Sequence, residues 1–177
     1  TTSSLGLVDH FRGYADYVIK YTLIEERQLV LDIGSNDGSL LRAFQAKKMR
    51  VLGVDPAIEI AKQATGNGIE TLPEFFNAKL AQQLREKYGP AKVITINNLL
   101  ANIDAMDDIF EGITQMLDAE GVFIVEFAYV GDLLRNMVFD YIYHEHLSYF
   151  SIKPITTFIA KFGLELIDAQ PQPTKGG

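Results

Sequence analysis

The sequence contains no cysteine, so it can form neither disulfide bonds nor thiolate metal sites. It has no long basic run, and its net charge of -7 would repel a phosphate-rich polymer, so we expect no nucleic acid partner. No apolar stretch reaches the roughly 18 residues that span a bilayer. The start, residues 1–4, lacks the pattern of a signal peptide. These absences predict a cytoplasmic protein without a membrane partner.

The composition is that of a folded domain. Hydrophobic residues make up 47% of the 177-residue chain, which argues against disorder and allows a sizeable core. We expect a single domain over residues 1–177. The chain begins without an initiator methionine, and residues 171–177 resemble a loop that stops before another element. We therefore expect it to be a piece of a longer protein.

Short apolar runs alternate with amphipathic stretches along the chain. The predicted strands cover 28–33, 51–54, 69–72, 92–96 and 121–127, with a last strand at 164–168. The predicted helices cover about 5–25, 39–48, 56–65, 77–88, 104–117 and 155–162, and Asp104 is the expected cap of the fifth. This alternation predicts an α/β fold with a doubly wound, mostly parallel sheet and helices on both faces, in which the last edge strand can be missing.

A glycine loop, residues 32–38, follows the first predicted strand. Glycine suits a sharp turn that a ligand approaches, and the loop and the next helix offer N–H donors. Asp32 would repel a pyrophosphate, but it would pair with the ammonium group of S-adenosylmethionine. Asn36 replaces the middle glycine of a dinucleotide loop, which disfavours a nicotinamide cofactor. We predict that Asp32, Gly34, Asn36 and Gly38 bind S-adenosylmethionine and its product S-adenosylhomocysteine.

Three further residues are candidates for the same cofactor because they follow predicted strands, where ligands of such sheets bind. Asp55 ends the second strand, 23 residues after Asp32, and its carboxylate can accept both ribose hydroxyls. Phe76 can stack on adenine or pack in the core. Asn97 can hydrogen-bond the cofactor or satisfy the loop backbone.

The histidine segment, residues 139–151, carries two of the three histidines and follows the fifth strand. Histidine can take up a proton near neutral pH, and a neighbouring carboxylate can orient it. Tyrosine can donate a hydrogen bond to a developing oxyanion. Tyr143, Glu145 and His146 thus contain the parts for abstracting a proton. A metal site is disfavoured, because a third ligand would have to come from far away.

The segments VLDIGSNDGSLL (30–41), VLGVDPA (51–57), 97–103 and FDYIYHEHLSYFS (139–151) resemble the C-methyltransferases that act on nucleotide-linked deoxysugars. The resemblance implies a class I, Rossmann-like fold. It also implies that His146 is the base, helped by Tyr143 and Glu145. The base would remove a proton next to a 4-keto group, and the resulting enolate would take the methyl group.

The resemblance further implies flanking zinc-binding and C-terminal domains of the same protein, which residues 1–177 do not include. Other functions stay open at this point. One is an O- or N-methyltransferase for another small molecule. Others are a non-catalytic nucleotide-binding domain and an NAD-dependent oxidoreductase. A cofactor-dependent change in melting temperature would separate these classes.

Overall fold

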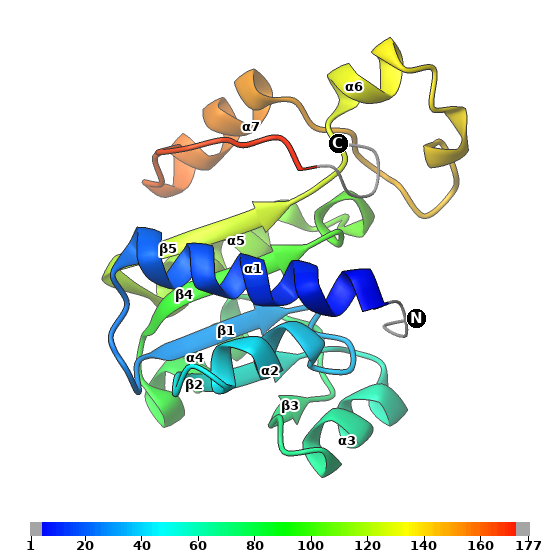
Figure 1. Cartoon of the computed structure of the whole chain (residues 1–177). Helices are drawn as coiled ribbons and strands as arrows, with labels where there is room; N and C mark the ends of the chain where they lie inside the picture. Colours follow the sequence, from blue (N-terminus) through cyan, green and yellow to red (C-terminus); the bar gives the residue numbers. More distant parts are fainter. Residues whose placement is uncertain (1–4, 173–177) are drawn as a thin grey trace.

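The computed structural model describes residues 5–172, which form a parallel sheet with helices on both sides (Figure 1). The strand order is β3-β2-β1-β4-β5. The strands are β1 (Leu29–Ile33), β2 (Arg50–Val54), β3 (Thr71–Leu72), β4 (Ala91–Asn97) and β5 (Leu117–Glu126). All four strand pairs are parallel, as the sequence predicts, and the order reverses between β1 and β4.

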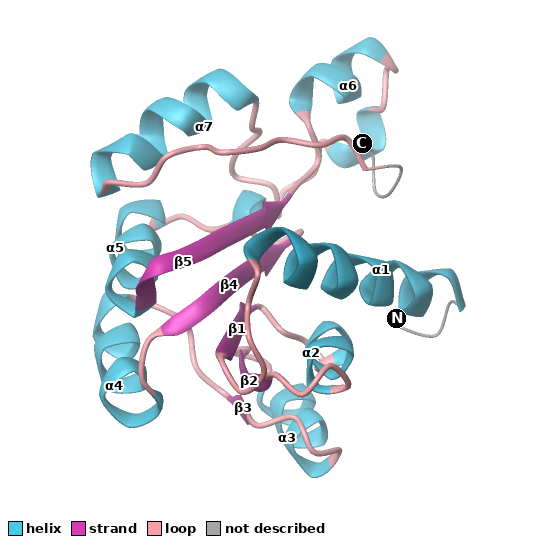
Figure 2. Cartoon of the chain, turned by 60° about the vertical axis from the view of Figure 1, so that its left-hand side comes forward, coloured by secondary structure: helices cyan, strands magenta, loops and turns pink. Residues whose placement is uncertain are grey.

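The helices cover both faces of the sheet (Figure 2). One face carries α1 (Leu5–Thr22), α2 (Ser39–Gln45) and α3 (Ile58–Gly66), and the other carries α4 (Ala78–Tyr88) and α5 (Met106–Met116). Beyond β5 follow α6 (Val130–Arg135) and α7 (Ile152–Ile159). Short 3-10 turns cover Leu100–Asn102, Phe139–Tyr141 and Ala160–Phe162. Within residues 5–172, no helix is long and apolar enough to cross a membrane.

Two apolar cores lie on the two faces of the sheet. Leu31 and Ile33 of β1 pack in the core under α4 and α5, whereas Val30 packs in the core under α1 and α2. Successive side chains of a strand point to opposite faces, so a strand buried on both faces needs an unbroken apolar run. The short apolar runs of the sequence therefore become the central strands of a doubly wound sheet.

Two local predictions were wrong. Residues 164–168 form no strand: Leu164 and Leu166 pack against the core, and Asp168 accepts a hydrogen bond from the Tyr17 hydroxyl, 3.1 Å away. Apolar alternation alone does not make a strand, which also needs a paired neighbour. Asp104 does not cap α5, because Ala105 occupies the N-cap position without a side-chain hydrogen bond.

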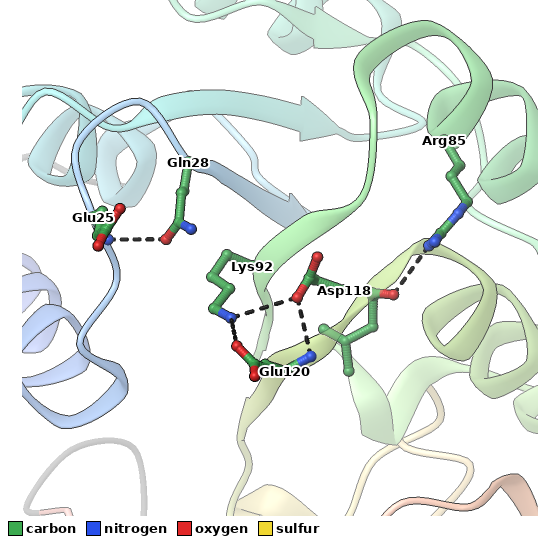
Figure 3. A network of polar contacts seen from close by, with 7 residues as sticks. Glu25, Gln28, Arg85, Lys92, Asp118 and Glu120 are labelled. Carbon is green, nitrogen blue, oxygen red and sulfur yellow. Dashed lines mark hydrogen bonds and ion pairs between the residues drawn. The ribbon is translucent and has the colours of Figure 1, made fainter.

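The amino end of the sheet is held by surface charges (Figure 3). Lys92 of β4 lies 3.4 Å from both Asp118 and Glu120 of β5. The Glu120 backbone N–H and the Lys92 ammonium group lower the pKa of Asp118. Arg85 of α4 donates to the Leu117 carbonyl oxygen at 3.0 Å. These contacts fasten the edge strand β5 at its start, far from the carboxyl ends where a ligand site is expected.

Candidate functional site

The glycine loop lies at the topological switch point, where ligands of open α/β sheets bind. Its backbone is left-handed at Gly34 (φ 76°), Asn36 (φ 50°) and Gly38 (φ 76°). A Cβ atom on Gly34 would lie 2.6 Å from Leu99 Cδ2, and one on Gly38 would lie 2.8 Å from Ile69 Cγ2. Both positions therefore require glycine for the turn and for close packing.

Asp55, at the end of β2, holds the glycine loop in place. Its Oδ2 accepts the Asn36 N–H and its Oδ1 accepts the Ala57 N–H, each at 2.9 Å. The side chain is buried, although each carboxylate oxygen can accept a second hydrogen bond. Asp55 thus has a structural role in the loop that the sequence did not reveal, and its contact with the cofactor ribose stays a prediction.

Asp32 is a buried carboxylate, 4% exposed, whose side chain accepts a 2.6 Å hydrogen bond from the Thr95 hydroxyl. Burial raises the pKa of Asp32 from its ordinary value of 3.8 to about 7; the Thr95 hydrogen bond reduces this effect and the Asp55 charge adds to it. Among residues 5–172, no cationic side chain forms an ion pair with Asp32. A cationic ligand group beside Asp32 would stabilise its charged form.

The other predicted cofactor residues differ in their surroundings. Asn97 ends β4, and both atoms of its amide group are buried without a hydrogen-bond partner in the described part of the chain. Phe76 is buried in the core, and its Cε1 lies 2.9 Å from where a Cβ on Gly112 of α5 would stand. This is the packing alternative for Phe76, and it does not support stacking on adenine.

His146 lines a cavity of about 380 Å³ at the carboxyl ends of β4 and β5, together with Asn98 and Tyr143. Its Nδ1 lies 2.8 Å from the Tyr141 carbonyl oxygen. Because a carbonyl oxygen can only accept, Nδ1 carries the hydrogen and Nε2 of the neutral ring keeps a lone pair. The Tyr143 ring is 4.2 Å from the His146 ring, measured between centroids. His146 is thus oriented to accept a proton at Nε2.

Glu145 is placed differently from the sequence interpretation. The side chain is exposed, and it makes no hydrogen bond or ion pair with any residue that the structure describes. The group that orients His146 is the Tyr141 carbonyl and not a neighbouring carboxylate. Adjacent residues in a turn point in different directions, so closeness in sequence did not bring the Glu145 carboxylate to the imidazole.

Residues 98–102 connect the histidine segment to the glycine loop. The backbone N–H groups of Leu147 and Ser148 donate to the Ala101 carbonyl oxygen at 2.8 and 3.2 Å. Leu99 packs on Gly34 at the other end of this stretch. The structure therefore brings both sequence motifs to the carboxyl edge of one sheet.

A polar group on α1 was missed from the sequence. Near the carboxyl end of the strands, His10 Nε2 lies 3.3 Å from Glu126 Oε2 of β5, and the Asn98 amide donates to Glu126 Oε1 at 3.2 Å. Tyr14, one turn after His10, has a buried hydroxyl without a partner in the described residues. The available signal was Glu126, a charged residue within the most apolar stretch of the chain.

No metal centre emerges from the geometry. Among residues 5–172, no group of three or more histidine, aspartate and glutamate side chains is placed to hold a metal ion. His144 and His146 belong to one turn, and the His146 Nδ1 is engaged by a carbonyl oxygen.

Comparisons with known proteins agree with this fold. Residues 9–169 match a family model described as a methyltransferase domain. The chain is 33% identical over 171 residues to the C-methyltransferase NovU of Streptomyces niveus, covering 97% of this chain and 41% of NovU. The chain thus spans about two fifths of the length of this curated relative.

Solved structures show the same fold at low sequence identity. A SAM-dependent methyltransferase from Archaeoglobus fulgidus has a TM-score of 0.68 at 18% identity, covering 88% of this chain and 67% of that protein. The plantazolicin methyltransferase BpumL, solved in complex with S-adenosylhomocysteine, has a TM-score of 0.61 at 15% identity, covering 87% of this chain and 64% of its own. The Rossmann-like, doubly wound fold expected from the sequence is confirmed.

Proposed function

The chain belongs to the methyltransferase domain family, and we propose that it binds S-adenosylmethionine at the glycine loop and serves the C-methylation of a 4-keto sugar nucleotide. The observation that carries the cofactor assignment is Asp32, a buried carboxylate at the switch point without a cationic partner in the described residues. A zwitterionic amino acid group fits this site, whereas a pyrophosphate would be repelled. The match to NovU supports carbon as the methylated atom.

The residues of the glycine loop have separate roles in this proposal. Asp32 pairs with the ammonium group of the cofactor, and the left-handed turns at Gly34, Asn36 and Gly38 keep the backbone close to it. Asp55 offers its remaining acceptor positions to the ribose hydroxyls while it holds the Asn36 N–H. When bound, S-adenosylmethionine supplies an electrophilic methyl group.

His146 is the proposed base. Its Nε2 accepts the proton from the carbon next to the keto group of the acceptor, and the Tyr141 carbonyl holds the ring through Nδ1 as the imidazolium forms. The Tyr143 hydroxyl donates to the carbonyl oxygen as it becomes an enolate. Glu145, exposed in this chain and next to His146 in the sequence, contributes a negative charge that favours the imidazolium. The bound cofactor would supply its methyl group to the enolate carbon; the S–CH3 bond would break, its electron pair would stay on sulfur, and S-adenosylhomocysteine would leave.

The site for the acceptor sugar includes more than the histidine segment. The chain covers only part of the length of NovU, and the flanking zinc-binding and C-terminal domains expected from the resemblance would complete the pocket. Mass spectrometry of the full-length protein with S-adenosylmethionine and a panel of 4-keto sugar nucleotides tests the acceptor. A product in which the added methyl group is bound to a carbon atom of the sugar supports the proposal. Methylation of oxygen or nitrogen would overturn the C-methylation assignment.

Asp55→Ala should weaken S-adenosylhomocysteine binding by about 10- to 100-fold, because hydrogen bonds to a charged group are worth about 1.5–3 kcal/mol. Isothermal titration calorimetry on this chain measures the effect. Glu59→Ala, which removes an exposed carboxylate on α3, is the matched control and should bind as the wild type does. Equal affinities for the wild type and Asp55→Ala would contradict the ribose assignment.

A further inference from the structure

Four polar side chains line one face of the sheet at its carboxyl edge, beneath α1. Asp32 of β1 is paired in register with Thr95 of β4, and Asn97 of β4 is paired with Glu126 of β5. Successive side chains alternate between faces, so Asp32, Thr95, Asn97 and Glu126 share the face on which α1 packs. Tyr14 of α1 is partly buried and packs against the apolar core of that face.

Unpaired hydrogen-bonding atoms are concentrated at this point. The Tyr14 hydroxyl and both amide atoms of Asn97 are buried, and none has a hydrogen-bond partner in the described residues. Burial, and after it the charges of Asp32 and Glu126, raise the pKa of Tyr14 well above its ordinary value of 10, while the polar Asn97 amide beside the hydroxyl lowers it. The hydroxyl therefore remains a neutral donor. Nearly all buried polar groups in proteins are paired, so this cluster indicates a missing ligand.

The buried polar groups define the chemistry of that ligand. Asp32 offers a buried negative charge, whereas Tyr14 and Asn97 offer an O–H donor and an N–H donor close by. An ammonium group would satisfy the first and a carboxylate would satisfy the other two. The two ligand groups would have to lie within a few ångströms of each other, as they do in an α-amino acid.

We propose, on the basis of the proposed function, that Tyr14 and Asn97 bind the carboxylate of the amino acid end of S-adenosylmethionine, with Asp32 on its ammonium group. The helix α1 then forms one wall of the cofactor site. His10, one turn before Tyr14, contacts Glu126 at 3.3 Å and holds this part of α1 against β5. Tyr14 is therefore a cofactor-binding residue on an element outside both sequence motifs.

Two ligands separate this role from general packing. S-adenosylhomocysteine carries the amino acid end, whereas 5′-methylthioadenosine has the same nucleoside and thioether without it. Calorimetry on this chain should show that Tyr14→Phe weakens S-adenosylhomocysteine binding by about tenfold, the loss expected for one hydrogen bond to a charged group. Binding of 5′-methylthioadenosine should not change. Tyr21→Phe, on an exposed part of α1, should bind both ligands as the wild type does.

The melting temperature without ligand provides an independent measurement. Tyr14→Phe removes an unpaired buried hydroxyl, so the ligand-free variant should melt at or above the wild-type temperature, while the stabilisation by S-adenosylhomocysteine shrinks. If Tyr14→Phe binds both ligands as tightly as the wild type does, the inference about Tyr14 is overturned. Equal weakening of both ligands also overturns it, because that result indicates packing. Failure of the wild type to bind either ligand overturns the proposed function, and this inference with it.

Discussion

His146→Asn in the full-length protein is expected to lower turnover by about 10²- to 10⁴-fold, the usual contribution of a positioned general base. The substitution is well matched to the geometry, because an asparagine amide can still donate to the Tyr141 carbonyl oxygen as Nδ1 does now. Asparagine has no group equivalent to Nε2, so it cannot take up the proton. Cofactor binding should be unchanged, since the glycine loop lies at β1 and the histidine segment follows β5.

Turnover is measured as S-adenosylhomocysteine release with an accepted 4-keto sugar nucleotide, and binding is measured by calorimetry. His144→Asn is the matched control, because His144 is exposed and belongs to the same turn. It should retain both turnover and binding. Wild-type turnover in His146→Asn would remove His146 from the mechanism. A loss of binding in His146→Asn would instead show that the histidine segment also helps to hold the cofactor.

Asp32→Asn is expected to stabilise the ligand-free chain at pH 8, by up to about 4 kcal/mol, which is the free energy of a pKa near 7 instead of 3.8. Well below pH 3.8 the carboxyl is protonated in both the folded and the unfolded state. Between pH 4 and 7 the unfolded state ionises while the folded state keeps its proton, so the folded state loses stability as the pH rises. Asparagine cannot ionise, so the variant escapes this loss.

Urea unfolding of the wild type and Asp32→Asn at pH 4.5, 6 and 8 measures the difference in free energy of unfolding. The difference should grow from pH 4.5 to 8. Glu59→Gln, an exposed carboxylate on α3, should show no comparable growth. A constant difference across this range would mean that the buried carboxyl of Asp32 does not titrate near pH 7.

Ionisation of Asp32 should also change the affinity for the cofactor. An ammonium group prefers ionised Asp32, so the affinity of the wild type for S-adenosylhomocysteine should rise about tenfold from pH 6 to 8. Asp32→Asn should bind more weakly at pH 8 and show a flatter profile. Stability and binding thus change in opposite directions in this variant, which is the behaviour of a charge buried for a ligand.

Local sequence patterns determined the architecture. Apolar runs at β1, β2, β4 and β5 predicted buried strands, and the amphipathic stretches between them predicted helices, because both signals depend on residues only a few positions apart. The left-handed conformations of Gly34 and Gly38 are local in the same way, since the tight turn after β1 favours glycine. Fold class and the position of the glycine loop were therefore accessible from the sequence.

Only the tertiary structure decided which polar groups meet. In the sequence, Tyr14 is one position within the predicted helix 5–25; packing of α1 places its hydroxyl near Asn97 and Asp32. Glu145 adjoins His146 in the chain, yet the Tyr141 carbonyl orients the ring. Residues 164–168 alternate like a strand but lack a paired partner. Such contacts join elements that are distant in sequence, so periodicity and spacing, which are local, carry no information about them.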